Sequence, residues 1–306
     1  MGGIDSLLVE FEEQSAALTA FARARIRRAS GGTLLVGAGD SYAAAMAGFF
    51  ASNGRCIAMD PYSLAAAPEV ARGLEVYFIS ASGRTASNVS AARKVKGIAK
   101  VTGAITAVEG STLAGIVDRV IPLPMEYRPR KVGILSFSLS LLAVLRLAGR
   151  DSSPDFRRAL TNARKDARSP GIGGGTTYIL GNSTGYAVAL YTGAKIYEVL
   201  GAKAQAELLE EFSHLELFSL TKHDQVCIFS CFDPGGMAKK LAGTLGESGY
   251  SARVIPSRGN TFVERLFHSV FVGQLFVLET ASKRGLSEPR FAGSAQRLRA
   301  SDSMIY

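Results

Sequence analysis

Residues 76–85 read Val-Tyr-Phe-Ile-Ser-Ala-Ser-Gly-Arg-Thr, and residues 86–97 behind them are rich in helix formers with a basic end. Four uninterrupted β-branched or aromatic residues predict a strand that is buried on both faces of a parallel sheet. Three hydroxyl side chains and a glycine then follow within six residues, and Thr85 stands where the N-cap of the next helix is expected. The sequence therefore predicts a strand, a hydroxyl-rich turn and a helix in direct succession.

This succession predicts an anion site. Free N–H groups and the positive end of the helix would point into the turn. The hydroxyls of Ser80, Ser82 and Thr85 would add hydrogen-bond donors, so the turn suits a phosphate monoester. No P-loop lysine and no Gly-x-Gly-x-x-Gly pattern is present, which disfavours a nucleoside triphosphate or a dinucleotide. The alternative is an ordinary capped turn between strand and helix, because Ser and Thr are common there.

The composition bounds the class of protein. A chain of 306 residues with 47% hydrophobic residues can form two modest domains. The formal charge is +9, but Arg and Lys are scattered apart from residues 23–28 and a basic tail. This charge indicates steering of an anionic small substrate, or a solvated surface, rather than nucleic-acid binding. We therefore expect no nucleic-acid partner.

The three cysteines are too few for a disulfide framework, and no pair of histidines lies near them to complete a zinc site. They are typical of small core residues in a reducing compartment. The N-terminal residues lack a signal-peptide pattern, and no apolar run reaches membrane-spanning length. We expect a cytoplasmic protein with no membrane partner, no metal and no other cofactor.

Apolar runs alternate with helical patterns along the whole chain, which predicts parallel, doubly wound α/β sheets. The expected strands cover residues 33–37, 55–59, 76–79, 101–106, 119–123, 177–181, 225–230 and 251–255. The expected helices cover residues 4–28, 42–53, 86–97, 111–116, 133–148, 154–167, a segment from 186, 235–247 and 262–283.

The pattern starts again after residue 176. Five residues recur at an offset of 144 (177 − 33): Thr33, Gly37, Tyr42, Ala43 and Ala45 return as Thr177, Gly181, Tyr186, Ala187 and Ala189. We infer a duplicated domain and expect an N-terminal helix in 1–30, a first domain in 31–150, a linker helix with a glycine-rich boundary in 151–175, and a second domain with a C-terminal tail in 176–306. The counterpart of the hydroxyl-rich turn, Ser-Cys-Phe-Asp-Pro-Gly at 230–235, lacks the hydroxyl set. One phosphate cradle per chain is therefore expected.

The second half carries a candidate catalytic set. Lys195 and Glu198 form an i, i+3 pair on one helix face, and His214 comes sixteen residues later (214 − 198). A carboxylate and an imidazole are the pair that proton transfer next to a carbonyl requires. The alternatives are a solvent-exposed ion pair for Lys195 and Glu198, and a helix cap for His214.

These residues resemble the double sugar isomerase (SIS) domain family. In the first half the resemblance rests on residues 37–42 (Gly-Ala-Gly-Asp-Ser-Tyr), on 79–85, on 104–106 leading to 111–114, and on Asp118. In the second half, residues 193–198 (Gly-Ala-Lys-Ile-Tyr-Glu) and 210–214 (Glu-Glu-Phe-Ser-His) resemble two motifs of the isomerase part of glucosamine-6-phosphate synthase. The resemblance covers roughly residues 30–295.

The resemblance implies two SIS domains, each a flavodoxin-like, doubly wound parallel β-sheet flanked by helices. It implies that hydroxyls hold the phosphate of a small sugar phosphate, those of Ser41, Ser80, Ser82 and Thr85. It further implies that Glu198 moves a proton between C1 and C2 through an enediol or enolamine, that Lys195 lies in the same pocket, and that His214 assists ring opening. Because that histidine often acts across the subunit interface in this family, a homodimer with a shared active site is expected.

The chain also departs from the family pattern. Related synthases carry a catalytic lysine after a Pro-Arg segment, whereas residues 289–294 read Pro-Arg-Phe-Ala-Gly-Ser and no lysine follows Lys283. Arg297 or Arg299 would be a poor proton carrier in its place. The sequence thus favours an aldose–ketose isomerase acting on a hexose 6-phosphate. A glucosamine-6-phosphate deaminase or phosphosugar deglycase, and a non-catalytic sugar-phosphate-binding regulator, stay open as alternatives.

Overall fold

The computed structural model describes residues 3–29, 31–129, 132–150, 153–167 and 174–305. It contains two sheets whose strand orders are β2-β1-β3-β4-β5 and β7-β6-β8-β9, and every strand pairing is parallel. The predicted fold class, α/β with two doubly wound parallel sheets, is confirmed. The chain divides into a five-stranded unit, residues 17–153 and 294–306, and a four-stranded unit, residues 1–16 and 154–293.

The five-stranded unit has two strands buried at every position at its centre, as continuous apolar runs predict. Its elements are β1 (Thr33–Val36), α2 (Asp40–Ala51), β2 (Cys56–Met59), α3 (Pro61–Ala66), η1 (Pro68–Ala71), β3 (Glu75–Ile79), α4 (Ala86–Val95), β4 (Val101–Thr106), β5 (Arg119–Pro122), α5 (Leu135–Leu147) and α11 (Ala295–Ile305). Small residues let α2 pack closely: a Cβ on Gly48 would come within 2.5 Å of the side chains of Leu35 and Val144. The predicted small-residue helix therefore packs closely against both β1 and α5.

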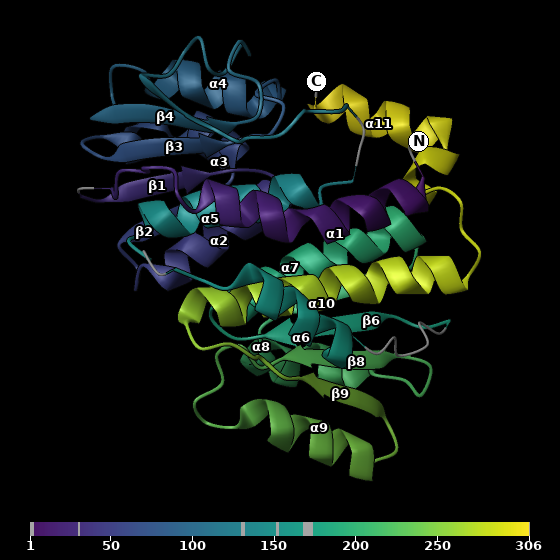
Figure 1. Ribbon diagram of the computed structural model, residues 1–306. Coiled ribbons are helices and arrows are strands. Elements are labelled where there is room, and N and C mark those ends of the chain that lie inside the picture. The colour runs from purple at the N-terminus through teal and green to yellow at the C-terminus, as the bar shows by residue number, and fades with distance from the viewer. Residues whose placement is uncertain (1–2, 30, 130–131, 151–152, 168–173, 306) are drawn as a thin grey trace. The chain divides into compact units, whose positions relative to one another are not determined.

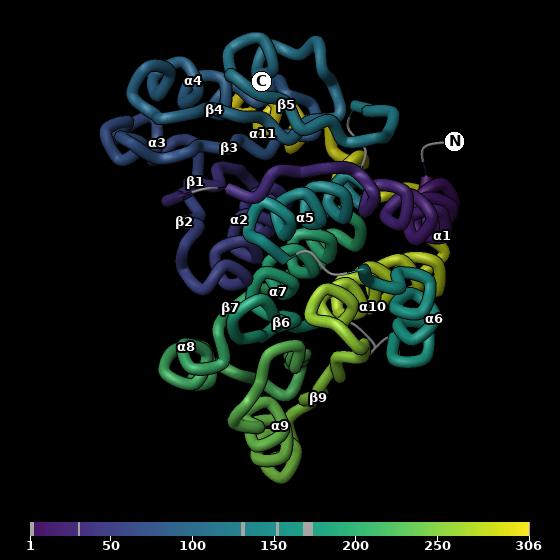
Figure 2. Tube along the Cα trace, turned by 60° about the vertical axis from the view of Figure 1, so that its left-hand side comes forward, coloured from purple at the N-terminus to yellow at the C-terminus, as the bar shows by residue number. Residues whose placement is uncertain are grey.

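The four-stranded unit is built around its longest helix, α10, which lies beside α6 in both views (Figure 1, Figure 2) and also contacts α7. Its elements are the start of α1 (Ile4–Phe21), α6 (Phe156–Asp166), β6 (Thr177–Gly181), α7 (Thr184–Lys195), the π-helix η2 (Ile196–Leu200), β7 (Ala204–Glu207), α8 (Leu209–His214), η3 (Glu216–Ser219), β8 (Gln225–Phe229), α9 (Met237–Glu247), β9 (Ser251–Ile255), α10 (Phe262–Lys283) and η4 (Arg290–Gly293). Edge-to-face ring pairs join α10 to α6 and α1. The ring centres of Phe267 and Phe156 are 4.9 Å apart, and those of Phe271 and Phe11 are 6.0 Å apart.

Several expected elements differ in the structure. The first helix ends at Phe21 rather than in the basic cluster, residues 111–116 form turns rather than a helix, and β7 and α11 were not predicted. The compact units also depart from the expected domain boundaries, because α11 groups with the five-stranded unit and residues 1–16 with the four-stranded one. Most of the expected glycine-rich boundary, residues 168–173, lies outside the described residues. Among the described helices, none has the length and apolarity needed to cross a membrane.

Candidate functional site

The hydroxyl-rich turn begins where β3 ends. The Ser80 N–H donates to the Ile105 carbonyl at 3.0 Å, so the chain stays in the sheet up to that residue. Gly83 then takes a φ of +60°, and its N–H donates to Ser80 Oγ at 3.1 Å. A Cβ on Gly83 would lie 2.0 Å from Ser111 Oγ, so only glycine fits there. The turn is thereby held in one tight conformation.

Three predicted phosphate-binding hydroxyls meet in this turn. Ser80 Oγ and Thr85 Oγ1 are 3.3 Å apart, and Ser82 Oγ accepts a hydrogen bond from the Arg84 N–H at 3.2 Å. Ser80 and Ser82 are buried, whereas Thr85 is half-buried and Arg84 is exposed. We call residues 80–85 with the first turn of α4 the cradle.

The helix end in the cradle is uncapped. Thr85 occupies the N-cap position of α4, as predicted, but its side chain makes no capping hydrogen bond and pairs with Ser80 instead. No described group accepts a hydrogen bond from the N–H groups of residues 86–88, and the first turn of α4 contains no acidic residue. Three donors and the positive helix end are therefore left for an anion.

One polar side chain of the cradle was missed in the sequence. Asn88, in the first turn of α4, is 2% exposed, and its Oδ1 has no hydrogen-bond partner among the described residues. A buried amide oxygen without a partner is uncommon in folded proteins. An asparagine three residues after an N-cap was the only signal, and it is a weak one.

Ser41 lies at the same edge of the sheet as the cradle. It is in the first turn of α2, which follows β1, and β1 pairs with β3. The strand order reverses between β1 and β3, and ligands of doubly wound sheets bind outside the carboxyl ends of the strands at such a switch point. Ser41 is half-buried, and no described contact joins it to Ser80, Ser82 or Thr85.

In the four-stranded unit, the structure brings Lys195 and Glu198 together. The Lys195 side chain is 1% exposed, its Nζ lies 2.5 Å from Glu198 Oε2, and it also lies 5.3 Å from the centre of the Tyr191 ring. The Glu198 side chain is 37% exposed. The pair is therefore not a surface ion pair: a buried ammonium orients a carboxylate that still reaches solvent.

A change in helix type presents this carboxylate. Lys195 is the last residue of α7, and Glu198 belongs to the π-helix η2 that follows. Such π-helical turns are rare and occur frequently at functional sites, since the extra residue per turn redirects side chains. A sequence pattern of i, i+3 spacing does not reveal this turn.

A buried polar network supports the ring beneath Lys195. Gln274 Nε2 donates to the Tyr191 hydroxyl at 2.9 Å, and Gln14 Nε2 donates to Gln274 Oε1 at 2.7 Å. All three side chains are fully buried. Satisfied buried networks rigidify their surroundings, so the position of Lys195 is well defined.

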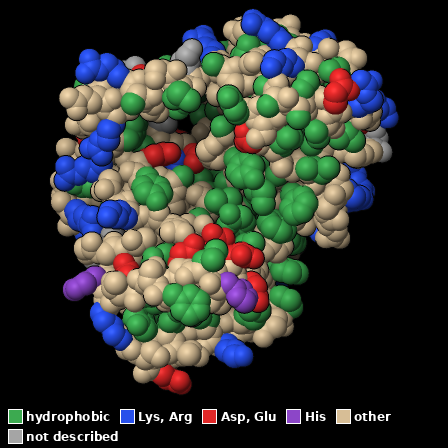
Figure 3. All heavy atoms as spheres, turned by 180° about the vertical axis from the view of Figure 1, so that it is seen from behind, with side chains coloured by type: hydrophobic (Ala, Val, Ile, Leu, Met, Phe, Trp, Pro, Cys, Tyr) green, Lys and Arg blue, Asp and Glu red, His purple; other side chains and the backbone are tan. Residues whose placement is uncertain are grey.

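His214 is not in contact with this pair. It ends α8, its side chain is 69% exposed, and its Nε2 lies 3.3 Å from Glu210 Oε1. The neighbouring segment is acidic, with Glu207, Glu210, Glu211 and Glu216, and Figure 3 shows acidic side chains gathered close to a histidine on one face. Among the described contacts, none joins His214 to Lys195 or Glu198.

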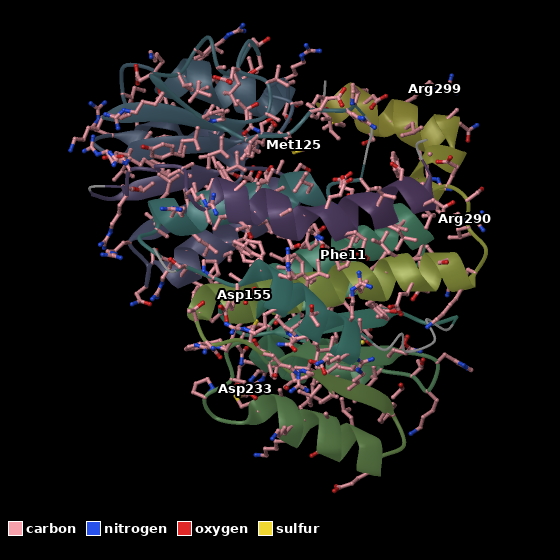
Figure 4. The ribbon with its side chains drawn as sticks, viewed as in Figure 1. Phe11, Met125, Asp155, Asp233, Arg290 and Arg299 are labelled. Carbon is pink, nitrogen blue, oxygen red and sulfur yellow. The ribbon has the colours of Figure 1, made fainter. Side chains whose placement is uncertain are left out.

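The segment that departs from the family pattern lies beside the π-helix. Arg290, labelled in Figure 4, begins η4, and η4 contacts η2. A Cβ on Gly201, the residue that ends η2 with a φ of +61°, would lie 3.0 Å from Arg290 Cβ. Arg297 and Arg299 lie further on, in α11, a helix that contacts α4.

The counterpart of the cradle in the four-stranded unit is already occupied by a side chain. Asp233, which Figure 4 labels near the start of α9, accepts hydrogen bonds from the N–H groups of Met237 at 2.9 Å and Ala238 at 3.0 Å. A carboxylate of the chain thus fills the anion position at this helix end. This agrees with the expectation of a single cradle.

Solved structures with this architecture are numerous. A glucosamine-6-phosphate deaminase from Thermotoga maritima matches with a TM-score of 0.74 and 21% identity over 92% of this chain and 95% of that one. The C-terminal domain of glucosamine-fructose-6-phosphate aminotransferase from Francisella tularensis matches with a TM-score of 0.72 and 17% identity over 92% and 97%. A tagatose-6-phosphate ketose/aldose isomerase from Escherichia coli matches with a TM-score of 0.68 and 19% identity over 92% and 90%.

No protein-family model matches the sequence, and no curated protein matches it either. The fold itself is nevertheless defined by the solved structures: the chain has the architecture of proteins with two sugar isomerase (SIS) domains. The similarity in fold extends over 97% of the C-terminal domain of that glucosamine-fructose-6-phosphate aminotransferase.

Proposed function

We propose that the protein is a phosphosugar isomerase that interconverts an aldose and a ketose hexose 6-phosphate. The observation that carries this proposal is the buried Lys195 ammonium holding the half-exposed Glu198 carboxylate at 2.5 Å on a π-helix. A positioned carboxylate that reaches solvent is suited to accept a proton from carbon. The fold likeness to a ketose/aldose isomerase acting on tagatose 6-phosphate supports the class of substrate.

In this proposal the cradle holds the phosphate of the substrate. The hydroxyls of Ser80, Ser82 and Thr85 and the free N–H groups at the start of α4 supply the donors that a dianionic phosphate needs. Ser41 would add a hydroxyl from the neighbouring turn. Phosphate binding would then be the task of the five-stranded unit and proton transfer that of the four-stranded one.

The proposed chemistry needs no redox step. Glu198 takes the proton from C2 of the open-chain aldose, and the electron pair of that bond forms the C1–C2 double bond of an enediol while O1 gains a proton. The proton on O2 then leaves as the C2 carbonyl forms, and Glu198 returns its proton to C1. The Lys195 ammonium, held beside the carboxylate, keeps Glu198 oriented between turnovers.

We further propose that His214 assists ring opening in a homodimer with a shared site. Its side chain is exposed and lies apart from Glu198 within the described contacts, as a group that serves another subunit would be. We expect sedimentation of the purified chain to show a dimer at assay concentrations. An active monomer at those concentrations would show that no second subunit is needed.

A deaminase or a deglycase is the second candidate within the same chemistry. The similarity to a glucosamine-6-phosphate deaminase favours it, because such enzymes share the enolamine step and then release the amine to water. Incubation with fructose 6-phosphate, with and without ammonia, and separately with glucosamine 6-phosphate, distinguishes the two. An isomerase forms an aldose phosphate without ammonia, whereas a deaminase releases ammonia from the amino sugar.

A non-catalytic sugar-phosphate-binding regulator is the third candidate, and the absence of a lysine after Lys283 favours it. Solvent exchange at carbon separates it from both enzymes. An enzyme exchanges the C1 or C2 hydrogen of its bound sugar phosphate with deuterated solvent, even when no net product forms. If the chain binds fructose 6-phosphate but exchanges no hydrogen at C1 of this ketose, the proposed isomerase is ruled out.

A further inference from the structure

A cavity of about 580 Å³ lies in the five-stranded unit at the edge of the sheet opposite to the cradle. It is bounded by the amino ends of β1 and β2, where Thr33 pairs with Cys56, and by the ends of α2 and α5. Its size falls in the range of sites for small molecules. Because the cradle lies at the carboxyl end of β3, at the other edge of the same sheet, the cavity is a separate feature of the unit.

Two guanidinium groups line this cavity, and its described lining contains no acidic residue. Arg55 is held in place, since its Nε donates to the Ser52 carbonyl at 3.2 Å and its Nη2 to the Ala148 carbonyl at 3.5 Å. Its Nη1 takes part in neither of these two hydrogen bonds. Arg28 makes no hydrogen bond or ion pair with any described residue.

The two guanidinium groups converge on consecutive residues. Arg55 reaches the carbonyl of Ala148, and Arg28 lies against Gly149, where a Cβ would come within 2.5 Å of its Nε. Gly149 takes a φ of +80°, so this close approach is built into the backbone at the end of α5. Both arginines also act on Cys56, where burial raises the pKa of the thiol and their charges oppose that rise.

Two like charges brought together without a carboxylate repel each other, and an anion placed with them removes that repulsion. Arginine forks match phosphate oxygens in geometry. The two carbonyl partners of Arg55 leave its Nη1 available, and the Arg28 guanidinium has no hydrogen-bond partner among the described residues. We propose that this cavity is a second anion site, which binds a small phosphorylated metabolite through its phosphate, with Arg28 and Arg55 as its clamp. The site is independent of the proposed isomerase reaction, because it shares no residue with the cradle.

Calorimetric titration with inorganic pyrophosphate tests the proposal on a chain whose cradle has been disabled by Ser82→Ala and Thr85→Ala. This variant should still bind pyrophosphate. Adding Arg28→Ala should weaken that binding at least about tenfold, because it removes charge-assisted hydrogen bonds. The matched control is Arg27→Ala, which removes an exposed neighbouring charge outside the cavity and should leave the affinity unchanged.

Two further titrants, AMP and glucose 6-phosphate, separate the sources of the phosphate. Tighter binding of AMP indicates a nucleotide, and tighter binding of glucose 6-phosphate indicates a sugar phosphate. The proposal is overturned if the cradle variant binds no pyrophosphate, or if Arg28→Ala and Arg27→Ala bind it equally well. Circular dichroism of each variant checks that it is folded, and Arg28 is suited to replacement because no described hydrogen bond depends on it.

Discussion

The β3–α4 turn and the β8–α9 turn occupy equivalent places in the two units. The N-terminus of the helix that follows is open in the first turn and capped by a side chain in the second. In the β3–α4 turn, hydroxyls pair with each other and the first N–H groups of α4 stay open. In the β8–α9 turn, the Asp233 carboxylate accepts from two N–H groups of α9. One of the two equivalent turns thus leaves its helix end open, and the other fills it with a carboxylate of the chain.

The comparison suggests a hypothesis that follows from the proposed function: the two copies divide the work. The five-stranded unit keeps an open helix end, and the first turn of α4 contains no acidic residue. The four-stranded unit closes that end and instead carries the carboxylate of Glu198 on a π-helix next to the buried Lys195. Under the proposed function, one copy binds the charge of the substrate and the other performs the proton transfer.

The largest expected effect is on turnover. Glu198→Gln should lower the turnover rate by about 10²–10⁴-fold or more, because an amide keeps the shape of the side chain but cannot accept a proton from carbon. Affinity for the sugar phosphate should stay near that of the parent chain, since the cradle is intact. Glu247→Gln, on the exposed face of α9, is the control. The role of Glu198 as base is excluded if the variant exchanges the C1 or C2 hydrogen with solvent at the parental rate.

The next-largest effect, on affinity for the sugar phosphate, should follow from placing in the cradle a carboxylate like that of the β8–α9 turn. Thr85→Asp places a carboxylate at the N-cap of α4, where it would accept from the free N–H groups and repel phosphate. We expect affinity for fructose 6-phosphate to fall by about 100-fold or more, while the free energy of unfolding rises by about 0.5–1 kcal/mol.

The control for this swap is Ser90→Asp, which adds the same charge at an exposed position of the same helix. Calorimetry measures the affinity and urea unfolding the stability. If both aspartate variants weaken binding equally, net charge rather than the helix end governs the affinity.

A smaller effect should follow removal of one cradle hydroxyl. Ser82→Ala deletes a hydrogen bond to a charged group, which is worth about 1.5–3 kcal/mol, so affinity for the sugar phosphate should fall roughly 10- to 150-fold. Stability should change little, because the hydroxyl accepts only one described hydrogen bond, from the Arg84 N–H. Ser90→Ala in α4 is the matched control. Unchanged affinity in the Ser82 variant would place the phosphate elsewhere.

The smallest effect, on stability, is expected in the β8–α9 turn, where Asp233 caps α9. Asp233→Ala removes the cap of α9 and should lower the free energy of unfolding by about 1 kcal/mol, without changing affinity for fructose 6-phosphate. Glu247→Ala at the other end of α9 should not destabilise the chain, since a negative charge there opposes the helix dipole. Thermal unfolding compares the two. A loss of sugar-phosphate affinity in the Asp233 variant would contradict the division of work between the turns.

Much of this fold was predictable, because continuous apolar runs such as 34–36 and 76–79 have few alternatives to buried strands. The hydroxyls of the cradle were also identifiable, since Ser80, Ser82 and Thr85 follow a strand directly. The edge strand β7 was not, as its sequence Ala-Gln-Ala-Glu has no apolar run and is half-buried at most positions. Residues 111–116 resemble a helix but form turns packed beneath Gly83.

The features that depend on tertiary contacts were hidden. Lysine is rarely buried, so the 1% exposure of Lys195 could not be inferred from its neighbours in sequence. The π-helix depends on packing of a whole helix rather than on the propensities of its five residues. The cap at Asp233 had a signal, an aspartate just before a helix with apolar spacing, which reads equally well as a plain turn.

The π-helix makes the position of the Glu198 carboxylate, the proposed base, unusually easy to lose in evolution. An α-helix advances about 100° per residue, so deletion of one codon between Lys195 and Glu198 would restore α-helical spacing and turn the carboxylate away from its ammonium partner. The cradle, encoded more than a hundred residues earlier, would be untouched. Under the proposed function, a single-codon deletion would therefore leave a protein that still binds sugar phosphates but no longer converts them, which is a short genetic path from an enzyme to a receptor.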